Sequence, residues 1–471
     1  MSGCVECGLC LLACPNLQLS PARAVEQVRL LRSERYARSP AFQRCNTCNR
    51  CELVCPERAA PFERMLDLFA DYRRQHGLGF GARLVLPSEA GNLWSCTQFM
   101  LPPEERAQVQ TWHRRFASGR RMETLLLTDF YTELTPHLAS LEVLAPLEPC
   151  MAGSPGLWGC GGDSHKLGLR AVTASVARLL EGVFERLGVR RVITFMQAEA
   201  AMLETVLPER YGARFSLDSI SSLDEWLLDG LRRGEIRPGP PSDGLVTIHD
   251  HCMSRYAGGK AQLVIREIVD QLGLRVREMV HSGPDALCCG WADAIPGLFE
   301  GGDSPLRSLL GLLRGLDRRL REAEATGAQL LVTSCPACHL FLHLMARLSG
   351  RRIRVRHLAD LVDREAGSPR ADRDERMDAR SADILAAAVT TALDWLRAGR
   401  KGRFDPRPPP SDRIEPLPHL PADRQQKLAR LSARLRPALG QPVAARAVRG
   451  AIAAVRLADA ARSLSALLPG T

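Results

Sequence analysis

Eight of the sixteen cysteines in this 471-residue chain form two short runs near its start. The first run is Cys4-x-x-Cys7-x-x-Cys10-x-x-x-Cys14-Pro15, and the second is Cys45-x-x-Cys48-x-x-Cys51-x-x-x-Cys55-Pro56. In each run the short spacings let three thiolates hold three corners of one iron–sulfur cube, while the cysteine before the proline ligates the other cube. The spacing therefore predicts two [4Fe–4S] clusters, one held by Cys4, Cys7, Cys10 and Cys55, the other by Cys45, Cys48, Cys51 and Cys14.

Zinc is the alternative metal for these thiols, since four thiolates also suit that ion. Zinc motifs usually pair two Cys-x-x-Cys units around one tetrahedral ion. Each run here has a third cysteine at the same step and a fourth cysteine before a proline. This spacing resembles that of bacterial ferredoxins and favours the cubane clusters.

A second constellation of five cysteines lies in the later part of the chain, at Cys252, Cys288, Cys289, Cys335 and Cys338. Five thiols are one more than a cubane cluster needs, and adjacent cysteines cannot both serve one tetrahedral ion without strain. A cluster with extra thiolate ligation, or a cubane with one exchangeable thiol, fits better than zinc, which stays the lesser alternative. Each group follows a predicted strand or loop, where α/β units place their sites.

Three histidines flank this constellation, at positions 249, 251 and 339. We interpret His249, His251 and His339 as polar residues at strand ends that donate hydrogen bonds to sulfur. Proton delivery by one of them is the sharper alternative.

The order Cys252, Cys288-Cys289-Gly290 and Cys335-Pro336-Ala337-Cys338 resembles the cysteine-rich "CCG" domain. That domain occurs in heterodisulfide reductase, the glycolate oxidase iron–sulfur subunit and the corresponding subunit of anaerobic glycerol-3-phosphate dehydrogenase. Those proteins place a two-cluster ferredoxin-like module ahead of two CCG domains, and the resemblance covers residues 1 to about 365. It implies a non-cubane or unusual [4Fe–4S] centre at the five cysteines, although the gap between Cys289 and Cys335 is longer than the family's usual spacing.

An internal repeat is visible when the segments 192–194 and 331–333 are aligned as equivalent strands. Met196 and Glu199 then fall where Cys335 and Cys338 stand, and Cys160 matches the adjacent cysteine pair. Cys160 and the nearby Cys150 are too few to hold a cluster. We therefore interpret the first copy as a degenerate CCG domain with a structural or docking role.

The elements that must position these residues alternate between strands and helices. Apolar periodicity and N-cap signals predict helices at 21–31, 62–72, 103–116, 172–187, 260–273 and 305–325. Buried strands are predicted at 124–128, 190–195, 244–250 and 329–333. In the tail, 378–399, 422–436 and 442–468 are expected to be helical and 404–421 extended; the last helix packs on the protein or a partner, or alternatively lies on a membrane surface.

The fold class predicted from these patterns is α+β and multidomain. A helical two-[4Fe–4S] ferredoxin-like domain at 1–76 is followed by a linker region at 77–121. A degenerate CCG domain at 122–238 and a CCG domain at 239–365 come next, followed by an Arg/Ala/Pro-rich, partly helical extension at 366–471. Cys96 lies alone in the linker region and is interpreted as a small buried residue.

Composition places the chain in a reducing compartment, since its cysteines form metal-ligand patterns and no signal peptide precedes Cys4. No apolar run approaches the roughly eighteen residues that span a bilayer. The chain is therefore expected to be cytoplasmic, or peripheral on the inner face of the membrane through a partner. The net charge of +10 is mostly arginine and is spread along the chain, with 5% aromatic residues. Anionic clusters account for that charge, and nucleic-acid binding is not expected.

Three functions remain open at this point. The first is an electron-transfer subunit of an oxidoreductase, in which a flavin-containing or iron–sulfur partner feeds the two cubanes and the CCG centre passes electrons to quinone, through a membrane subunit, or to another acceptor. The second is a catalytic subunit that reduces a disulfide or persulfide at the CCG centre, like heterodisulfide reductase. The third is a non-catalytic iron–sulfur sensor or scaffold. No Gly-x-Gly-x-x-Gly follows a strand and no P-loop is present, so a flavin or nucleotide site in this chain is not expected.

Overall fold

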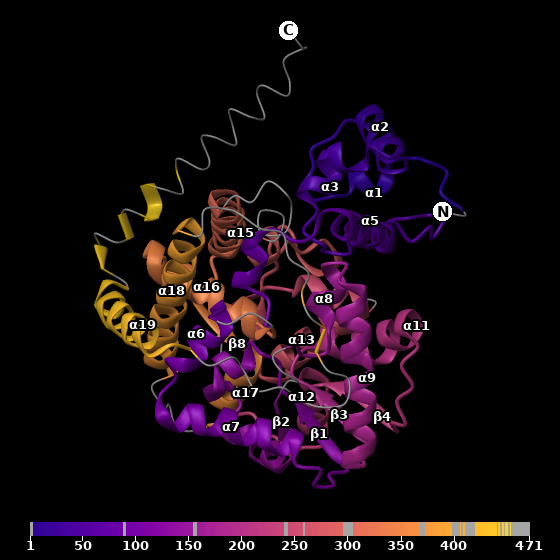
Figure 1. Ribbon diagram of the computed structural model, residues 1–471. Coiled ribbons are helices and arrows are strands. Elements are labelled where there is room, and N and C mark those ends of the chain that lie inside the picture. The colour runs from indigo at the N-terminus through magenta and orange to yellow at the C-terminus, as the bar shows by residue number, and fades with distance from the viewer. Residues whose placement is uncertain are drawn as a thin grey trace.

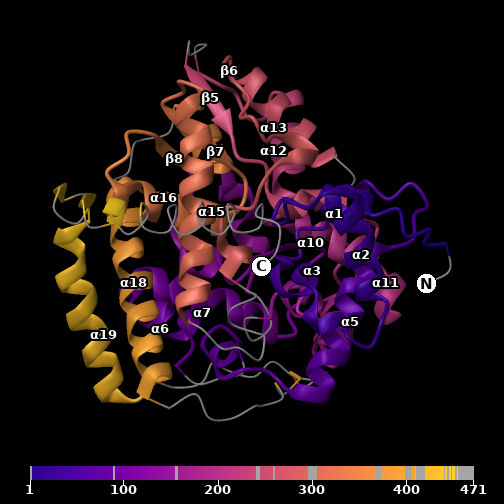
Figure 2. The same cartoon turned by 90° about the horizontal axis from the view of Figure 1, so that it is seen from above.

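The structure is a computed structural model, and it describes residues 3–87, 91–153, 158–239, 244–257, 260–294, 305–367, 373–397 and 420–439, with isolated positions between 406 and 409 and between 441 and 453. A helical unit at the N-terminus stands beside two α/β units, and the C-terminal helices α18 and α19 lie on the opposite side of the molecule (Figures 1 and 2). Within the described residues, none of the helices has the length and apolar character that a membrane span requires.

The N-terminal unit consists of short helices that carry the two cysteine runs. Ser20 caps the helix α2 through a hydrogen bond to the amide of Arg23, and Pro21 occupies its first position, as the sequence predicts. The predicted helix at 62–72 extends over a full sixteen residues as α5. The elements are α1 (Leu9–Leu12), α2 (Pro21–Leu31), η1 (Tyr36–Arg38), α3 (Pro40–Arg44), α4 (Arg50–Leu53) and α5 (Pro61–His76).

The first α/β unit contains a four-stranded parallel sheet in the order β2-β1-β3-β4. The sequence predicts two of these strands, β1 and β3, but does not predict the short strands β2 and β4. The strands are β1 (Thr124–Leu127), β2 (Met151–Ala152), β3 (Arg191–Thr194) and β4 (Ser219–Ser222). The connecting helices are η3 (Thr132–Leu134), η4 (Pro136–Leu138), η5 (Glu142–Cys150), α8 (Gly162–Lys166), α9 (Arg170–Leu187), α10 (Gln197–Ala201), the π-helical turn η7 (Met202–Val206), α11 (Leu207–Tyr211) and α12 (Leu223–Arg232).

The second α/β unit has a parallel sheet in the order β6-β5-β7-β8, so its strands are arranged as in the first sheet. Its strands are β5 (Leu245–Ile248), β6 (Arg275–Val276), β7 (Leu330–Thr333) and β8 (Arg354–His357). Its helices are η8 (Cys252–Ala257), α13 (Lys260–Gln271), η9 (Gly283–Asp285), α15 (Pro305–Ala325), α16 (Pro336–Ser349) and α17 (Leu358–Glu365). In both sheets the strand carboxyl ends meet at one edge, where α/β proteins build their sites.

One apolar core joins the two α/β units. It combines Ile193 and Leu227 of the first unit with Ile248, Ile268 and Val332 of the second, and all five are buried. Burial of such side chains contributes roughly 1.5–3 kcal/mol each. The two repeats are therefore held together by a shared interior and not by a surface contact alone.

Residues 77–121, where three glycines and a proline (Gly77, Gly79, Gly81 and Pro87) indicate a linker, are packed into the protein. The segment forms η2 (Phe80–Leu84), α6 (Leu93–Phe99) and α7 (Pro103–Ala117), of which the sequence predicts the last. Trp94 of α6 and Trp112 of α7 are almost fully buried, in two different cores. The physical reason is that these large aromatic side chains bury far more apolar area than an exposed connection could. The predicted domain boundaries themselves stay a prediction.

The C-terminal extension packs back onto the second unit through α18 (Arg373–Arg397) and α19 (Ala422–Leu435), followed by η10 (Arg436–Ala438). Two of the three predicted tail helices are therefore present, within a few residues of their expected bounds. Most of the predicted extended segment 404–421 and of the predicted helix 442–468 lies outside the described residues.

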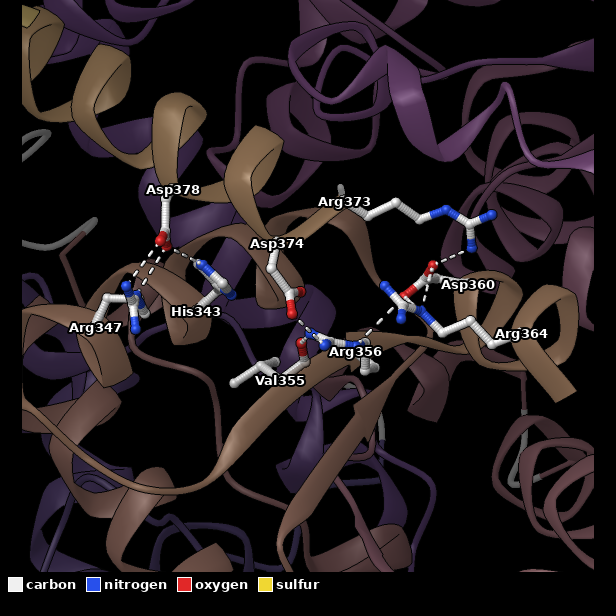
Figure 3. Close-up of polar contacts among 9 residues, drawn as sticks. All are labelled: His343, Arg347, Val355, Arg356, Asp360, Arg364, Arg373, Asp374 and Asp378. Carbon is white, nitrogen blue, oxygen red and sulfur yellow. Dashed lines mark hydrogen bonds and ion pairs between the residues drawn. The ribbon is translucent and has the colours of Figure 1, made fainter. Parts of the chain in front are cut away.

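Ion pairs fix α18 to the second unit (Figure 3). Asp378 accepts hydrogen bonds from His343 at 2.8 Å and from Arg347 at 2.9 Å. Arg373 donates to Asp360, a buried carboxylate that also accepts from Arg364. Burial would raise the pKa of Asp378, but its bonds to His343 and Arg347 lower that pKa overall.

Replacement of Asp360 by alanine is expected to release α18. The carboxylate is 4% exposed and faces three arginines. Two of them keep a second carboxylate, Arg373 with Asp363 and Arg356 with Asp374, so the disrupted buried pairing should cost about 3 kcal/mol, the lower end for a broken buried pair. Amide hydrogen exchange along α18 should accelerate by roughly 100-fold or more, since each 1.4 kcal/mol is tenfold. Asp374→Ala is the control, because Asp374 is 53% exposed and its loss should cost at most about 1 kcal/mol. Equal exchange in the two variants would contradict the prediction.

Candidate metal centre

The two N-terminal cysteine loops follow the same backbone path. Left-handed φ values occur at equivalent positions, +57° at both Glu6 and Thr47, and +80° and +62° at Gly8 and Asn49. Side chains other than glycine rarely adopt this conformation, so three such residues indicate a backbone held by local interactions. The amide of Thr47 donates to the Sγ atom of Cys45 at 3.4 Å. The loops are therefore shaped to direct backbone N–H groups at sulfur, as anion-binding turns do.

The first group of thiols gathers around Cys10. Burial, and then the charges of Cys7, Cys4 and Cys55, raise the pKa of Cys10 to about 11. Three of these cysteines come from the first run, and the fourth comes from the end of the second run. The structure thus brings together the four residues predicted for the first cluster, and their role as its ligands stays a prediction.

The second group of thiols lies beside the first. Burial raises the pKa of Cys51 well above its usual value, and the charges of Cys45, Cys48, Cys10 and Cys14 raise it further. Cys14 comes from the first run, so the fold brings it to the second group as crossed ligation requires, and the ligation itself stays a prediction. The influence of Cys10 on Cys51 shows that the two groups are neighbours.

The five cysteines of the second unit form one continuous cluster of buried thiols. Each is hydrogen-bonded to the next in the order Cys252, Cys288, Cys289, Cys338, Cys335. All five are at most 7% exposed. The structure therefore brings together the whole predicted constellation, from three segments that are far apart in the sequence.

Each segment of this cluster is positioned by a strand end or a tight turn. Cys252 begins η8 after β5, and Cys335 caps α16 after β7, where its Sγ atom accepts a hydrogen bond from the amide of Cys338 at 3.4 Å. Gly290 has a φ of +113°, and a Cβ atom there would lie 2.6 Å from the carbonyl oxygen of Leu312. Only glycine lets the Cys288-Cys289 loop approach α15 so closely.

The charge on the cluster is shared unevenly between its thiols. Hydrogen bonds from Cys252 and Cys289, with further donation from the amides of Gly290 and Ala292, lower the pKa of Cys288 well below its ordinary value. The amide of Gly290 lies 3.3 Å from the Cys288 Sγ atom. These donors stabilise a thiolate, which is the form that binds metal.

Two of the three flanking histidines contact the thiol cluster. One ring nitrogen of His249 lies within 4.8 Å of the sulfur atoms of Cys289 and Cys338, and His251 forms a similar group with Cys335 and Cys338. Arg319 donates from Nε to the Nδ1 atom of His249 at 3.2 Å, so the ring proton of His249 is on Nε2 and available to the thiols. The third histidine, His339, packs against His343 and His357.

The corresponding position in the first α/β unit has lost its thiols. Met196 precedes α10 as Cys335 precedes α16, and the Glu199 carboxylate accepts from the amide of Met196 at 3.3 Å. Burial, and then the charge of Glu199, raise the pKa of Cys160 well above its usual value. The charges that act on Cys150 are instead those of Arg115 and Arg191. A carboxylate therefore stands where the second copy has a cysteine.

Replacement of Cys160 by serine is expected to leave the iron content unchanged. Cys160 packs in an apolar core, and the charged side chains of the described residues that influence its pKa are Glu199, Asp163 and Lys166, with no cysteine among them. The measurement is iron per chain after anaerobic reconstitution, with Cys289→Ser as the matched variant in the second copy. A loss of several irons in the Cys160 variant would overturn the degenerate-copy interpretation.

Several charged residues of the site were missed by sequence reasoning. Asp293 accepts hydrogen bonds from Asn46 at 2.6 Å and Asn16 at 3.5 Å, and burial followed by the charge of Cys288 raises its pKa to about 7. Burial likewise raises the pKa of Asp129, after β1, to about 7. The position of Asp129 after a strand could have marked it. Arg255 carries no such signal, because only the tertiary fold brings it to the N-terminal unit.

Sulfur donors with backbone N–H groups around them fit iron–sulfur clusters at all three groups of thiols. The mixed histidine and cysteine groups around Cys338 would also suit zinc, with its preference for nitrogen and sulfur ligands. Measurement of iron and zinc per chain distinguishes an iron–sulfur cluster from a zinc ion at this site.

Comparison with known protein families agrees with this arrangement. Residues 1–59 match the family model described as a 4Fe-4S dicluster domain, and residues 246–343 match the cysteine-rich CCG domain. The two matches contain the eight N-terminal cysteines and the five clustered cysteines of the second unit.

Among curated proteins, the chain is similar to a probable membrane-anchored ferredoxin of Chromohalobacter salexigens. The two are 26% identical over 206 residues, which is 40% of this chain. In this match the chain spans 29% of the relative's own length.

Proposed function

We propose that this chain is the electron-transfer subunit of an oxidoreductase complex. The proposal is supported by its two matched domains, which together fit the iron–sulfur superfamily of heterodisulfide reductase and anaerobic glycerol-3-phosphate dehydrogenase. An iron–sulfur electron-transfer role is also in keeping with the similarity to a ferredoxin. The donor, the acceptor and the partner subunits belong to the proposal.

The linear order of the three groups of thiols carries this proposal. The charge of Cys10 in the first group raises the pKa of Cys51 in the second. The charge of Cys288 in the five-cysteine group likewise raises the pKa of Cys48 in the second. Exposure falls along the same order, from the exposed Cys7 to the buried Cys48 and the fully buried cluster. Such an arrangement suits entry of electrons at the exposed end and delivery at the buried end.

The residues that would hold the two cubane clusters are Cys4, Cys7, Cys10 and Cys55, and Cys45, Cys48, Cys51 and Cys14. The five cysteines 252, 288, 289, 335 and 338 would hold the third centre. When bound, these clusters supply one-electron redox chemistry. The chain itself contributes the thiolates, the backbone donors and the burial that protect the centres from water.

In the proposed complex a flavin-containing or iron–sulfur subunit approaches the N-terminal unit. Val5, Leu9 and Leu53 are exposed around the thiols of the first group, so an apolar surface is available to such a subunit. A membrane subunit that reacts with quinone is the proposed acceptor, which would place this chain at the inner face of the membrane.

The test of the cofactor assignment is metal analysis after anaerobic reconstitution. Three centres predict about twelve irons per chain. A chain with about eight irons and one zinc would show that the five-cysteine site binds zinc instead. Purification of the native complex and identification of its co-purifying subunits then tests the partners.

A catalytic role in disulfide or persulfide reduction is the second candidate. His251 is hydrogen-bonded to Cys335, and the buried Glu199 and Asp129 carboxyls lie close enough to influence each other's pKa and to be influenced by Cys335. Proton donors beside a redox-active thiol cluster are what such a reaction requires. A thiol alkylator or a disulfide analogue should then perturb the EPR signal of the third centre in the isolated, oxidised chain. An unchanged signal favours the electron-transfer function.

A further inference from the structure

The junction between the N-terminal unit and the second α/β unit contains a buried arginine. Arg255 is 3% exposed and lies in η8, three residues after Cys252. Its guanidinium donates to the carbonyl oxygens of Cys48 at 2.9 Å and Cys252 at 3.3 Å. One side chain therefore bonds the backbone of a thiol residue from the second N-terminal group and of another from the five-cysteine group.

The same guanidinium also forms hydrogen bonds within the second α/β unit. It donates to the carbonyl oxygen of Pro284 at 2.9 Å and to that of Ala286, both in the loop that leads to Cys288. All four acceptors are main-chain carbonyls. Across the part of the chain that the structure describes, no carboxylate forms an ion pair with Arg255, so its positive charge is buried without a countercharge in contact.

A buried, unpaired cation is costly unless anionic groups lie near it. Arginine cannot shed its proton to avoid this cost. The thiolates on either side can supply the missing countercharge. Burial raises the pKa of Cys48, and the charge of Arg255 opposes that rise. Two acidic side chains of this region have described bonds to the N-terminal unit: Asp285 pairs with Arg50, and Asp293 accepts from Asn46 and Asn16.

Other contacts keep the two units together and would remain without Arg255. Arg50 pairs with Asp285 at 2.6 Å, and the rings of Phe62 and Tyr256 meet edge to face with centroids 5.6 Å apart. The junction is thus built from several interactions, and Arg255 contributes to it a buried positive charge that bonds the backbone of both groups of thiols.

We propose that Arg255 is a positioning residue that couples the second N-terminal centre to the five-cysteine centre and raises the reduction potential of both. This inference rests on the proposed function, since it requires redox-active clusters at both groups of thiols. Reduction adds negative charge to a cluster, and a fixed positive charge nearby stabilises the reduced form. The first N-terminal centre should feel this charge less, because among the described cysteines Arg255 bonds only the backbone of Cys48 and Cys252.

The test is an EPR-monitored redox titration of the reconstituted full chain and of two variants. Arg255→Gln removes the charge but keeps an amide that can donate to carbonyls. Arg255→Lys keeps the charge but loses the planar fork that reaches several acceptors at once. Arg232→Gln is the control, because Arg232 lies on α12 and pairs at the surface with Glu267, remote from the thiols.

The expected result is a shift to more negative potential for the second and third centres in Arg255→Gln. The first centre should be unchanged and serves as the internal reference. Arg255→Lys should titrate close to the wild-type chain, as should Arg232→Gln. Unchanged potentials in Arg255→Gln, or an equal shift of all three centres, would overturn the proposal.

Iron content decides the remaining outcomes. If Arg255→Gln loses iron while Arg255→Lys retains full iron and wild-type potentials, the charge is required and the proposal stands. If both variants lose iron, Arg255 is a structural clamp only and the electrostatic role is overturned. A wild-type chain whose third site holds zinc, or whose centres do not reduce, would instead refute the proposed function.

Discussion

Replacement of Cys338 by serine is expected to remove about four of the twelve or so irons and to abolish electron transfer to the final acceptor. Cys338 contacts both Cys289 and Cys335, so its thiol joins two of the three segments that form the five-cysteine cluster. Serine oxygen is a much poorer ligand for iron–sulfur chemistry than thiolate. Low-temperature EPR should still show the two N-terminal centres, which should still accept electrons from a donor.

The matched control for this experiment is Cys96→Ser. Cys96 is as buried as Cys338, but it lies in α6 and its Sγ atom hydrogen-bonds the carbonyl oxygen of Gly91. Its replacement should leave the iron content and the electron transfer intact. Wild-type transfer by the Cys338 variant would show that the five-cysteine site is structural, and would contradict both proposed functions.

Removal of iron is expected to unfold the first half of the N-terminal unit while the two sheets persist. Its apolar clusters are small, and one of them consists of Leu11, Leu17, Ala24, Val28 and Ala41. So few buried side chains rarely stabilise a unit of this size, which then depends on bound metal for its folding free energy. Amide hydrogen exchange of α2 in the iron-free chain should approach that of an unstructured peptide.

The helix α5 supplies the internal comparison for this prediction. It lies directly against the first α/β unit, because a Cβ atom on Gly168 would lie 2.9 Å from the carbonyl oxygen of Leu66. Glu63 of α5 also approaches His165 at 3.4 Å. We therefore expect α5 to retain partial protection when α2 loses it, and β3 and β7 to stay fully protected. Unchanged protection of α2 without iron would contradict the prediction.

The sequence predicted the elements whose signals are local. Ser20 and Pro21 mark the start of α2 because capping depends on adjacent residues, and α15 has the expected bounds because its apolar stripe is long. The strands β2 and β6 were missed because two residues carry no periodicity. The strands β4 and β8 were missed because each has only one apolar residue among its four. The helix α16 was also missed: it is buried on nearly all sides, so its sequence lacks the polar face that would mark it.

At the site, too, only the residues marked by a local sequence pattern could be predicted. The thiol positions were predictable because cluster ligation fixes their spacing in the sequence. The contacts of Arg255 with Cys48 were not, because they join segments 207 residues apart and follow from how two units dock. The packed α6 was hidden for a related reason: its partners, α18 among them, lie near the other end of the chain.

The apolar core shared by the two α/β units has a consequence for how a duplicated protein can change over time. If the first copy holds no metal, as we interpret it, positions 196 and 199 are free of ligation, and Met196 and Glu199 can stand there without harm to the other centre. The interior positions of the first copy are not free to change, because Ile193 and Leu227 form part of the surface on which Ile248 and Val332 pack. A truncation that removed the first α/β unit would expose the interior of the second unit to water. On this interpretation, a copy without its own metal centre would be retained because it completes the interior of the other copy.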